Sequence, residues 1–579
     1  MKSPAAPASL GPRYKWVALS TTTLGVLIAT INSSILLIAL PDIFRGLQID
    51  PLASGNSSYL LWLIMGYLVV TAVLVVTFGR LGDMYGRVKM FNAGFAIFTL
   101  FSIALSVTWL TGTPGVLWLI VMRILQGVGG ALLMANSSAI ITDAFPSHQR
   151  GLALGLNMVS GIAGSFLGLV IGGVLAPVHW RYVFLVSVPF SIFGTLWGYL
   201  KLHDLSPRRH HVMDWWGNIT FALGLIGVLV AITYGIQPYG DHVMGWTNPW
   251  VLASMIGGLV LLAIFSVIEV RVAHPMFHLD LFRIRAFTFG NVASLLSGLG
   301  RGGLMFILII WLPRHGYSFE STPLWAGIFM LPMTVGFLVA GPLSGWLSDR
   351  YGARPFATGG MVIAALSFLW FAALPVNFSY WTFAAAQFFN GFGMGLFASP
   401  NRAAVMNALP ANRRGVGSGM STTFQNASMV LSIGIFFSLM IIGLAGSLPA
   451  TMQSGLSAHG VPLQQAHAIA ALPPVAVLFA SLLGYNPVQQ LLGSHTLSRL
   501  DPTDAQYLTG HSFFPSLISG PFHDGLIVAF GFAIVACLVA AVASWFMGEK
   551  FVHSDDQHEA PTEGSGVSAD AVEAEQVRS

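Results

Sequence analysis

Long apolar runs recur along the whole chain and constrain its fold more than any other feature. A helix that crosses a membrane needs about 20 predominantly apolar residues, and fourteen stretches meet this condition. Only 8% of the residues are charged, whereas about 25% are charged in a soluble domain. So few charges cannot cover a soluble surface of this size, and the sequence therefore predicts an all-α membrane protein. The predicted spans are 16–40, 58–78, 90–110, 115–137, 151–174, 182–202, 215–236, 250–270, 286–312, 324–347, 356–375, 381–400, 416–445 and 525–547.

The distribution of basic residues predicts the orientation of these spans. The first apolar run is too long for a signal-peptide core, so we interpret it as a retained span. An even number of spans puts both termini on one side, and basic residues favour cytoplasmic loops. With the N-terminus inside, 19 Lys and Arg residues fall in cytoplasmic segments and 4 in outer loops. We therefore predict a multi-pass protein of the plasma (inner) membrane with both termini in the cytoplasm.

A short polar loop separates the second and third predicted spans. A tight turn between two long helices favours glycine, because glycine tolerates positive φ, and this loop contains three glycines. It also carries basic residues, as a cytoplasmic loop should, and an acid that can hydrogen-bond a neighbouring arginine or helix end. These residues are Gly79, Gly82, Asp83, Gly86, Arg87 and Lys89.

The loop pattern belongs to an internal repeat. Gly79-x-Leu81-x-Asp83-x-Tyr85-Gly86 recurs 266 residues later as Gly345-x-Leu347-x-Asp349-x-Tyr351-Gly352, next to Arg350. Gln126-Gly127-x-Gly129 recurs 264 residues later as Asn390-Gly391-x-Gly393. Such offsets indicate a duplicated six-helix unit with two helices inserted, and transporters place their solute site between such halves. The predicted parts are an N-terminal segment (1–15), a six-helix bundle (16–202), two inserted helices with linkers (203–285), a second bundle (286–547) with a long extracytoplasmic segment (446–524), and a disordered cytoplasmic tail (548–579).

Several motifs resemble those of the major facilitator superfamily. The loop is similar to the signature G-x-L-a-D-r-x-G-r-k, and the fifth span, Gly164-x-x-x-Gly168-Leu169-x-x-Gly172-Gly173, resembles the antiporter motif, with Leu169 in place of its proline. Trp180-Arg181-x-x-Phe184 and Pro189 resemble the stretch W-R-w-i-F-x-x-n-v-P, which is typical of the fourteen-helix QacA/EmrB-like drug:proton antiporters. The resemblance implies a major facilitator fold with fourteen helices (6 + 2 + 6). It also implies alternating access, with inner latches around Asp83–Arg87 and Asp349–Arg350.

Arginines inside predicted spans are candidates for the solute site, because a charge at that depth costs several kcal/mol. Arg123 and Gln126 lie in the fourth span, in a stretch that resembles the superfamily motif R-x-x-q-G-x-g-a, and Arg301 lies in the ninth. Arg123 is then a coupling residue that faces a cavity, or an arginine satisfied by backbone carbonyls. Two such arginines would favour an anionic or amphiphilic solute. Further polar candidates for the cavity are Asn32, Asn157, Asn291, Gln387, Asn390, Gln425 and Asn426.

One position departs from the antiporter branch. In the antiporter branch the first helix carries an aspartate at the position where this chain has Asn32. Every Asp and Glu of this chain falls in a loop, a tail or a helix end. Proton coupling needs a titratable group, so Asp42, Asp83, Asp143 or the solute itself would have to supply the proton. The alternative is a uniporter or a lipid or anionic-amphiphile translocator that uses no proton gradient.

The function predicted from these features is efflux of lipophilic, drug-like compounds by a transporter that acts as a monomer in the lipid bilayer. A sensory or scaffold protein on the same fold is a third class, with 446–524 as its working part. Within 446–524, Val475–Leu492 is apolar and is expected to pack on the membrane surface or across the cavity mouth. We found no nucleotide loop, metal-ligand cluster or nucleophile constellation, so we predict no enzyme, no cofactor, no metal and no nucleic-acid partner.

Overall fold

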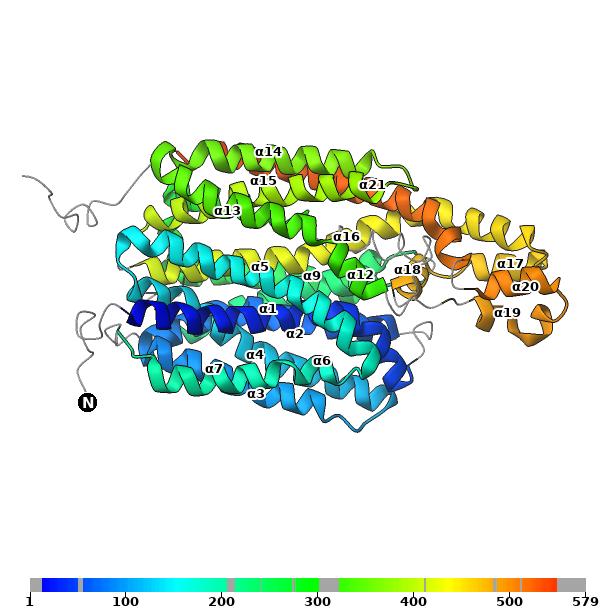
Figure 1. Ribbon diagram of the computed structural model, residues 1–579, viewed down its shortest axis with the longest axis horizontal. Helices are drawn as coiled ribbons and strands as arrows, with labels where there is room; N and C mark the ends of the chain where they lie inside the picture. The colour runs from blue at the N-terminus through cyan, green and yellow to red at the C-terminus, as the bar shows by residue number, and fades with distance from the viewer. Residues whose placement is uncertain are drawn as a thin grey trace, which may run out of the picture.

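Long helices run side by side through the computed structural model (Figure 1). The first, α1 (Tyr14–Leu47), begins at the end of the bundle where the last, α21 (Phe513–Trp545), finishes, and this end is called the terminal end below. The chain between α16 and α21 contains short helices that lie beyond the opposite end, and this part is called the outer subdomain below. The structure describes residues 13–49, 56–205, 214–240, 242–272, 275, 277–300, 322–410, 413–482, 486, 488–510 and 513–548.

The helix contacts repeat from one half of the chain to the other. In the first half α1 packs on α5, α2 and α3 pack on α4, and α3 packs on α7; in the second half the corresponding pairs are α10 with α16, α13 and α14 with α15, and α14 with α21. Between the halves, α2 packs on α16 and α5 packs on α12 and α13. The remaining helices of the first half are α2 (Asn56–Tyr85), α3 (Arg87–Ser106), α4 (Gly112–Ala144), α5 (Ser147–Val178), α6 (Tyr182–Leu185) and α7 (Ser187–Lys201). Those of the second are α10 (Arg285–Leu299), α12 (Thr322–Phe329), α13 (Leu331–Tyr351), α14 (Ala353–Ala372), α15 (Tyr380–Asn407) and α16 (Arg414–Ala458).

Two glycines at repeat-related positions separate consecutive helices. Gly86 lies between α2 and α3 with φ +110°, and Gly352 lies between α13 and α14 with φ +83°. A residue with a Cβ is strained at such angles. The chain therefore reverses at both places within one residue, as the repeated loop pattern predicts.

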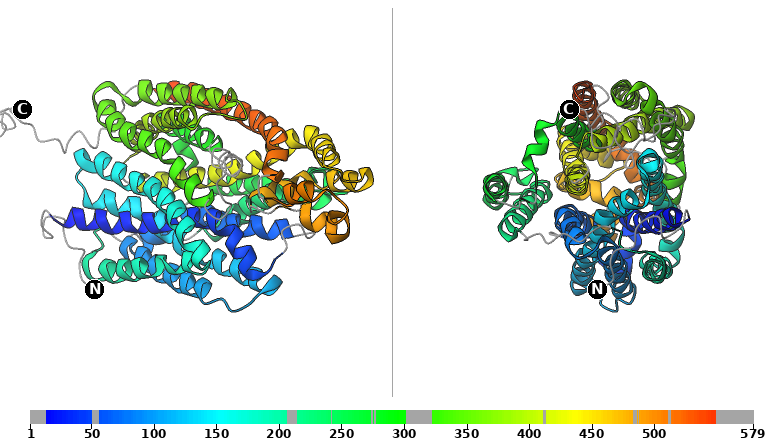
Figure 2. Two further views of the ribbon diagram at one scale, coloured as in Figure 1. Left: turned by 45° about the vertical axis from the view of Figure 1, so that its right-hand side comes forward. Right: turned by 90° about the vertical axis from the view of Figure 1, so that its left-hand side faces the viewer.

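The inserted pair packs beside the bundle. Helices α8 (Trp215–Gly235) and α9 (Pro249–Arg271) pack on each other, with the short η2 (Gly245–Thr247) between them. Helix α8 also contacts α2 and α16, one helix from each half. In the end-on view of Figure 2 the pair lies at the side of the two halves, before η3 (Leu279–Arg283) leads into α10.

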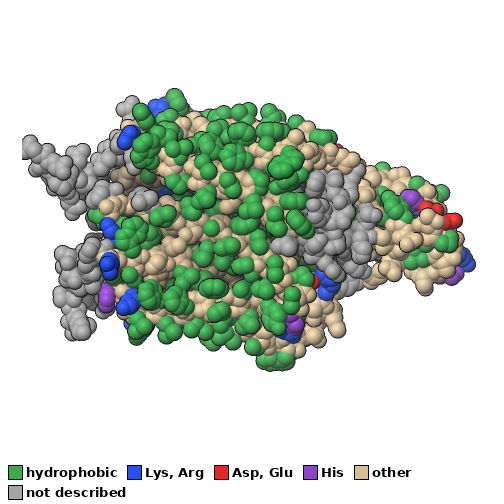
Figure 3. All heavy atoms as spheres, viewed as in Figure 1, with side chains coloured by type: hydrophobic (Ala, Val, Ile, Leu, Met, Phe, Trp, Pro, Cys, Tyr) green, Lys and Arg blue, Asp and Glu red, His purple; other side chains and the backbone are tan. Residues whose placement is uncertain are grey.

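The prediction of an all-α membrane protein is confirmed, but the number of spans is not. Twelve helices in the described part of the chain are long and apolar enough to cross a membrane. The predicted span 286–312 is described only through α10, and the more polar α15 is not among the twelve. Apolar side chains cover the flank of the bundle, and basic side chains gather at the terminal end (Figure 3). Exposed Lys89, Lys201 and Arg350 lie at helix termini of that end.

The outer subdomain extends two helices beyond their predicted spans. Helix α16 continues to Ala458, because its Leu448, Met452 and Leu456 are buried, and α21 begins at Phe513, twelve residues earlier than predicted. The apolar run Val475–Leu492 contains two short helices, and α18, of nine residues, is too short to cross a membrane. It packs on α2 and α16. The short helices are α17 (Leu463–Ala470), α18 (Pro474–Leu482), α19 (Val488–Leu497) and α20 (Pro502–Thr509).

Candidate functional site

Arg123 of α4 lies in the interior of the first half, with only 1% of the residue exposed. Its Nη1 donates to the side-chain oxygen of Asn32 on α1 and, over 2.8 Å, to Oε1 of Gln126, one turn further along α4. The ring of Tyr67 on α2 lies 4.7 Å from the guanidinium carbon. The structure thus brings together three predicted site residues, Asn32, Arg123 and Gln126, and adds Tyr67, which nothing in its sequence neighbourhood singled out.

The polar side chains next to these four residues are neutral. Nε2 of Gln126 donates to Oγ of Ser102 on α3 over 2.8 Å, and Ser187 of α7 lies 3.4 Å from the same hydroxyl. Two buried nitrogens, Nε of Arg123 and Nδ2 of Asn32, have no hydrogen-bond acceptor among the described residues. The cluster therefore holds one positive charge and more donors than acceptors. We call Asn32, Tyr67, Arg123 and Gln126 the Arg123 cluster.

The second half repeats part of this arrangement without the charge. Asn390, the repeat partner of Gln126, donates to Oγ of Ser367 over 2.7 Å, as Gln126 does to Ser102. The position 264 residues after Arg123 holds Gln387, which is fully buried and donates to the sulfur of Met330. Asn426 is half-buried on α16 and has no described contact with the Arg123 cluster. Arg301, also a candidate, lies outside the described residues.

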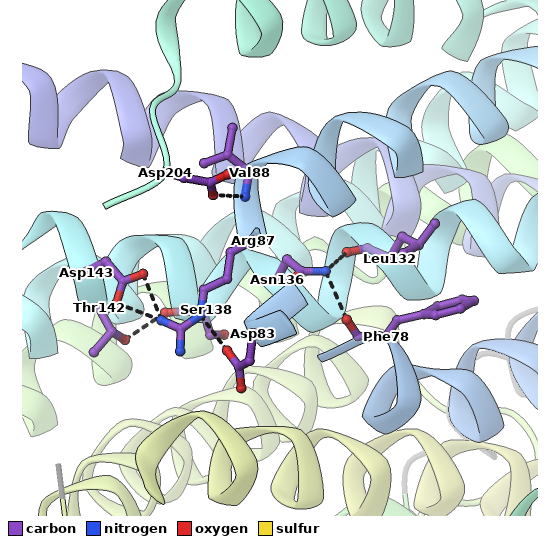
Figure 4. A network of polar contacts seen from close by, with 10 residues as sticks. All are labelled: Phe78, Asp83, Arg87, Val88, Leu132, Asn136, Ser138, Thr142, Asp143 and Asp204. Atoms are coloured by element: carbon purple, nitrogen blue, oxygen red, sulfur yellow. Dashed lines mark hydrogen bonds and ion pairs between the residues drawn. The ribbon is translucent and has the colours of Figure 1, made fainter. Parts of the chain in front are cut away.

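Around the first loop, a network ties the ends of α2, α3 and α4 together at the terminal end (Figure 4). Nε of Arg87 donates to Asp83 over 2.8 Å, and its Nη1 contacts both oxygens of Asp143 at 2.6 and 2.7 Å. Asp204 accepts from the backbone N–H of Val88 over 2.8 Å and so caps α3, because Gly86 has no side chain to do so. Sequence reasoning missed this cap, since Asp204 is remote in sequence. Gly79 is half-buried, and a Cβ added to it would have nothing within 4 Å, while Lys89 is exposed.

The second loop is arranged differently. Arg350 is exposed, and its guanidinium lies 4.4 Å from the ring of Trp346, one turn earlier on the same helix. The side chain of Asp349 lies outside what the structure describes. The described contact of Arg350 is thus within α13, whereas Arg87 joins three helices.

The glycines of α5 allow a close approach to α1. A Cβ at Gly164, Gly168 or Gly172 would lie within 3.0 Å of a backbone carbonyl oxygen of α1, and Gly173 beside them is buried. The positions 264 residues after Gly164 and Gly168 hold serines instead. Ser428 and Ser432 donate to carbonyl oxygens of α10 over 2.5 and 2.8 Å. The same helix contact is therefore made by bare backbone in one half and by hydroxyl bonds in the other.

One further arginine contacts both halves. Arg402 on α15 donates to Gln425 on α16 over 3.3 Å and to Ser138 on α4 over 3.2 Å. Sequence reasoning did not assign it a role. The sequence did offer a signal for this arginine. Arg402 lies within a helix, shortly beyond a stretch rich in glycine and phenylalanine, and has no acid near it in sequence.

The sequence matches known proteins along most of its length. A family model described as Major Facilitator Superfamily matches residues 22–275 and 290–447. The riboflavin transporter RibZ of Clostridioides difficile is 28% identical, over 79% of this chain and 95% of that protein. The methyl viologen resistance protein SmvA of Salmonella typhimurium is 28% identical, over 81% and 92%. The tetracenomycin C resistance and export protein of Streptomyces glaucescens is 26% identical, over 82% and 85%.

Solved structures give the same fold. The proton:xylose symporter XylE aligns with a TM-score of 0.52 at 14% identity, over 81% of this chain and 95% of the symporter. A bacterial homologue of the lysosomal transporter Spinster aligns with a TM-score of 0.53 at 14% identity, over 93% and 98%. The predicted major facilitator fold is confirmed, and the chain is a membrane transporter that belongs to the major facilitator superfamily.

Proposed function

We propose that this transporter exports small lipophilic solutes across the plasma membrane by alternating access, with both termini in the cytoplasm. The observation that carries the proposal is that relatives named for resistance and export match about four fifths of the chain. The superfamily model matches residues of both halves and of the inserted pair. Other relatives are named for multidrug resistance. The basic residues at the terminal end support its cytoplasmic placement.

The structure contains contacts that alternating access would have to break and re-form. The halves contact each other near the terminal end through Arg402 and Ser138, and further along through Leu169 of α5 and Gly327 of α12. Alternating access requires that these two contacts open in turn. The Arg87 network holds the ends of three helices as one unit, so it acts as the inner latch within the first half.

Coupling of transport to protons would need a titratable group within the membrane-spanning helices. Most acids of the described spans lie near helix ends: Asp83 and Asp143 are bound to Arg87, Glu269 is near the end of α9, and Asp42 is bound to Arg45. Asp524 lies inside α21, but it is exposed in the part of that helix beyond the predicted span and accepts a hydrogen bond from Ser447. The hydrogen-bond partners of Arg123 are neutral. This arrangement favours transport that is uncoupled, or in which the solute carries the proton, over a proton relay in the middle of the membrane.

The test uses the purified full-length protein in proteoliposomes loaded with a fluorescent lipophilic dye. Export is expected to require the protein and to be slowed by Asp83→Asn. Dye flux is then measured with an imposed pH gradient, with and without an uncoupler. An unchanged flux supports uncoupled transport, a collapsed flux supports proton coupling, and equal flux in protein-free vesicles refutes export.

A further inference from the structure

The Arg123 cluster contains an unneutralised charge. Among the described residues no carboxylate is ion-paired with Arg123, and its hydrogen-bond partners are the amide oxygens of Asn32 and Gln126 together with the backbone oxygen of Asn32. Tyr67 contributes only a ring face. Cation–π contact and neutral acceptors solvate a guanidinium in part, but they do not cancel its charge.

The cluster also has donors without acceptors. Asn32 and Gln126 both direct their oxygens at Nη1 of Arg123, which leaves Nδ2 of Asn32 and Nε of Arg123 unpartnered. A buried donor without an acceptor costs free energy. An additional hydroxyl or amide would satisfy one donor and leave the charge, whereas an anionic oxygen acceptor would satisfy both donors and the charge.

The surroundings define the rest of the ligand. On the face of α1 that carries Asn32, the residues one turn away are apolar and buried: Ile28, Ala29, Ile35 and Leu36. A small hydrated anion would lose its water shell against these side chains at high cost. An organic anion with an apolar body would bury that body and present its charged oxygens to the donors.

We propose that the Arg123 cluster binds the anionic oxygens of an amphiphilic solute, such as a carboxylate, sulfonate or phosphate ester, through Nε of Arg123 and Nδ2 of Asn32. The inference rests on the proposed transport function and names the solute class for it. The solute supplies the negative charge that pairs with Arg123, because the chain places an amide and not a carboxylate beside this arginine.

The test measures thermal unfolding of the purified full-length protein with decanesulfonate and with decyltrimethylammonium, which have equal chain lengths and opposite charges. Ligands that bind the folded state raise the unfolding temperature with concentration. We expect decanesulfonate to raise it and decyltrimethylammonium to leave it unchanged. Equal shifts with both probes would show a detergent effect and overturn the proposal.

Asn32→Asp is the decisive variant, because it places a carboxylate beside Arg123 and keeps the arginine. We expect a higher unfolding temperature without ligand and no response to decanesulfonate. Asn92→Asp on α3 makes the same chemical change outside the cluster and should keep the response. If Asn32→Asp cannot be purified, Arg123→Gln is used, with the same expected loss. A response retained in either cluster variant refutes the site, while a response in a protein that exports no dye refutes export alone.

Discussion

Arg402 and Ser138 are 3.2 Å apart and 264 residues apart in sequence, which is the offset that relates the two halves of the chain. They therefore occupy equivalent positions on equivalent helices, α15 and α4, and meet where the halves face each other. Equivalent residues can touch in this way only close to the pseudo-twofold axis between the repeats. The contact is asymmetric in chemistry, since one position supplies an arginine and the other its acceptor.

Removing this contact should favour opening at the terminal end. A hydrogen bond to a charged group contributes about 1.5–3 kcal/mol, and about 1.4 kcal/mol is a tenfold change in an equilibrium. Arg402→Ala should therefore raise the population open at this end about tenfold. The reporter is Val76→Cys, a buried residue whose Cα would lie 4.0 Å from a Cβ at Gly419 of α16, in a Cys537→Ala background.

Maleimide labelling of that cysteine should accelerate about tenfold in Arg402→Ala. Arg354→Ala is the matched control, because Arg354 lies 3.8 Å from the ring of Trp545 within the second half. It should label at the parent rate. Equal acceleration by both variants would mean a general loosening and not the loss of an inter-half contact.

The Arg87 network predicts an unequal effect of the two repeated loops. Asp83→Asn removes one of the two carboxylates that hold Arg87, so the ends of α2, α3 and α4 lose a charged link. Export should fall severalfold in proteoliposomes while the amount of inserted protein changes little. Arg350→Ala should have a smaller effect, because the contact described for Arg350 is with Trp346 on the same helix. The reverse order would contradict the assignment of the first loop as the latch.

The α1–α5 contact predicts where glycine is indispensable. A Cβ at Gly168 would lie 2.5 Å from the backbone oxygen of Ile31, and backbone cannot move aside as a side chain can. Gly168→Ala should therefore lower stability by about 1–3 kcal/mol. At Gly155 on the same helix nothing lies within 4 Å, and Gly155→Ala should stabilise by up to about 1 kcal/mol. Thermal unfolding in detergent distinguishes the two, and equal behaviour would refute the packing argument.

Sequence reasoning succeeded where a local pattern carries the constraint. Apolar length predicted the helices, and the repeated loop predicted the turns at Gly86 and Gly352, because the backbone at both requires glycine. It also singled out Arg123 as a charge within an apolar run, Gln126 from the motif around it, and Asn32 as the departure from the branch's aspartate; the structure places these three together, and their role in transport stays a prediction. It could not place Tyr67 or Asp204, whose roles depend on residues far away in the chain.

The extent of the outer subdomain shows a different limit. The predicted end of the thirteenth span followed membrane thickness, but α16 continues as far as its apolar face finds partners. Those partners include Leu517 of α21, which contacts the chain at Gly455. Spanning length fixes a minimum for a helix, and tertiary contacts outside the apolar window fix its actual end.

Alternating access predicts that a cross-link between the halves stops transport. A Cβ at Gly327 of α12 would lie 3.2 Å from Cβ of Leu169 on α5, near the range of about 3.5–4.5 Å for disulfides. Oxidised Leu169→Cys/Gly327→Cys should therefore block export, and a reductant should restore it. The control Gly345→Cys/Ser399→Cys, with a Cβ separation of 3.8 Å within the second half, should export in both states. Export by the oxidised cross-half pair would rule out separation of the halves at this point.

The contacts of α8 predict which half carries the inserted pair. Helix α8 is joined to α2 by hydrogen bonds near both of its ends: Thr77 donates to Asn218 over 2.6 Å, and Trp62 donates to Tyr234 over 3.1 Å. Its described contact with α16 is apolar, where Gly434 faces the side chain of Ile232. Polar links hold a fixed register, whereas an apolar contact can slide, so α8 should move with the first half.

A disulfide across the apolar contact tests this directly. A Cβ at Gly434 would lie 3.6 Å from Cβ of Ile232, within the range that disulfides prefer. If α8 moves with α2, oxidised Ile232→Cys/Gly434→Cys ties the two halves together and should slow export severalfold, reversibly on reduction. Asn218→Ala, which frees α8 from Thr77, should relieve part of that block when it is added to the oxidised pair, because α8 can then follow α16. Full export by the oxidised pair would instead place α8 with the second half, and the hydrogen bonds to α2 would have to break in each cycle.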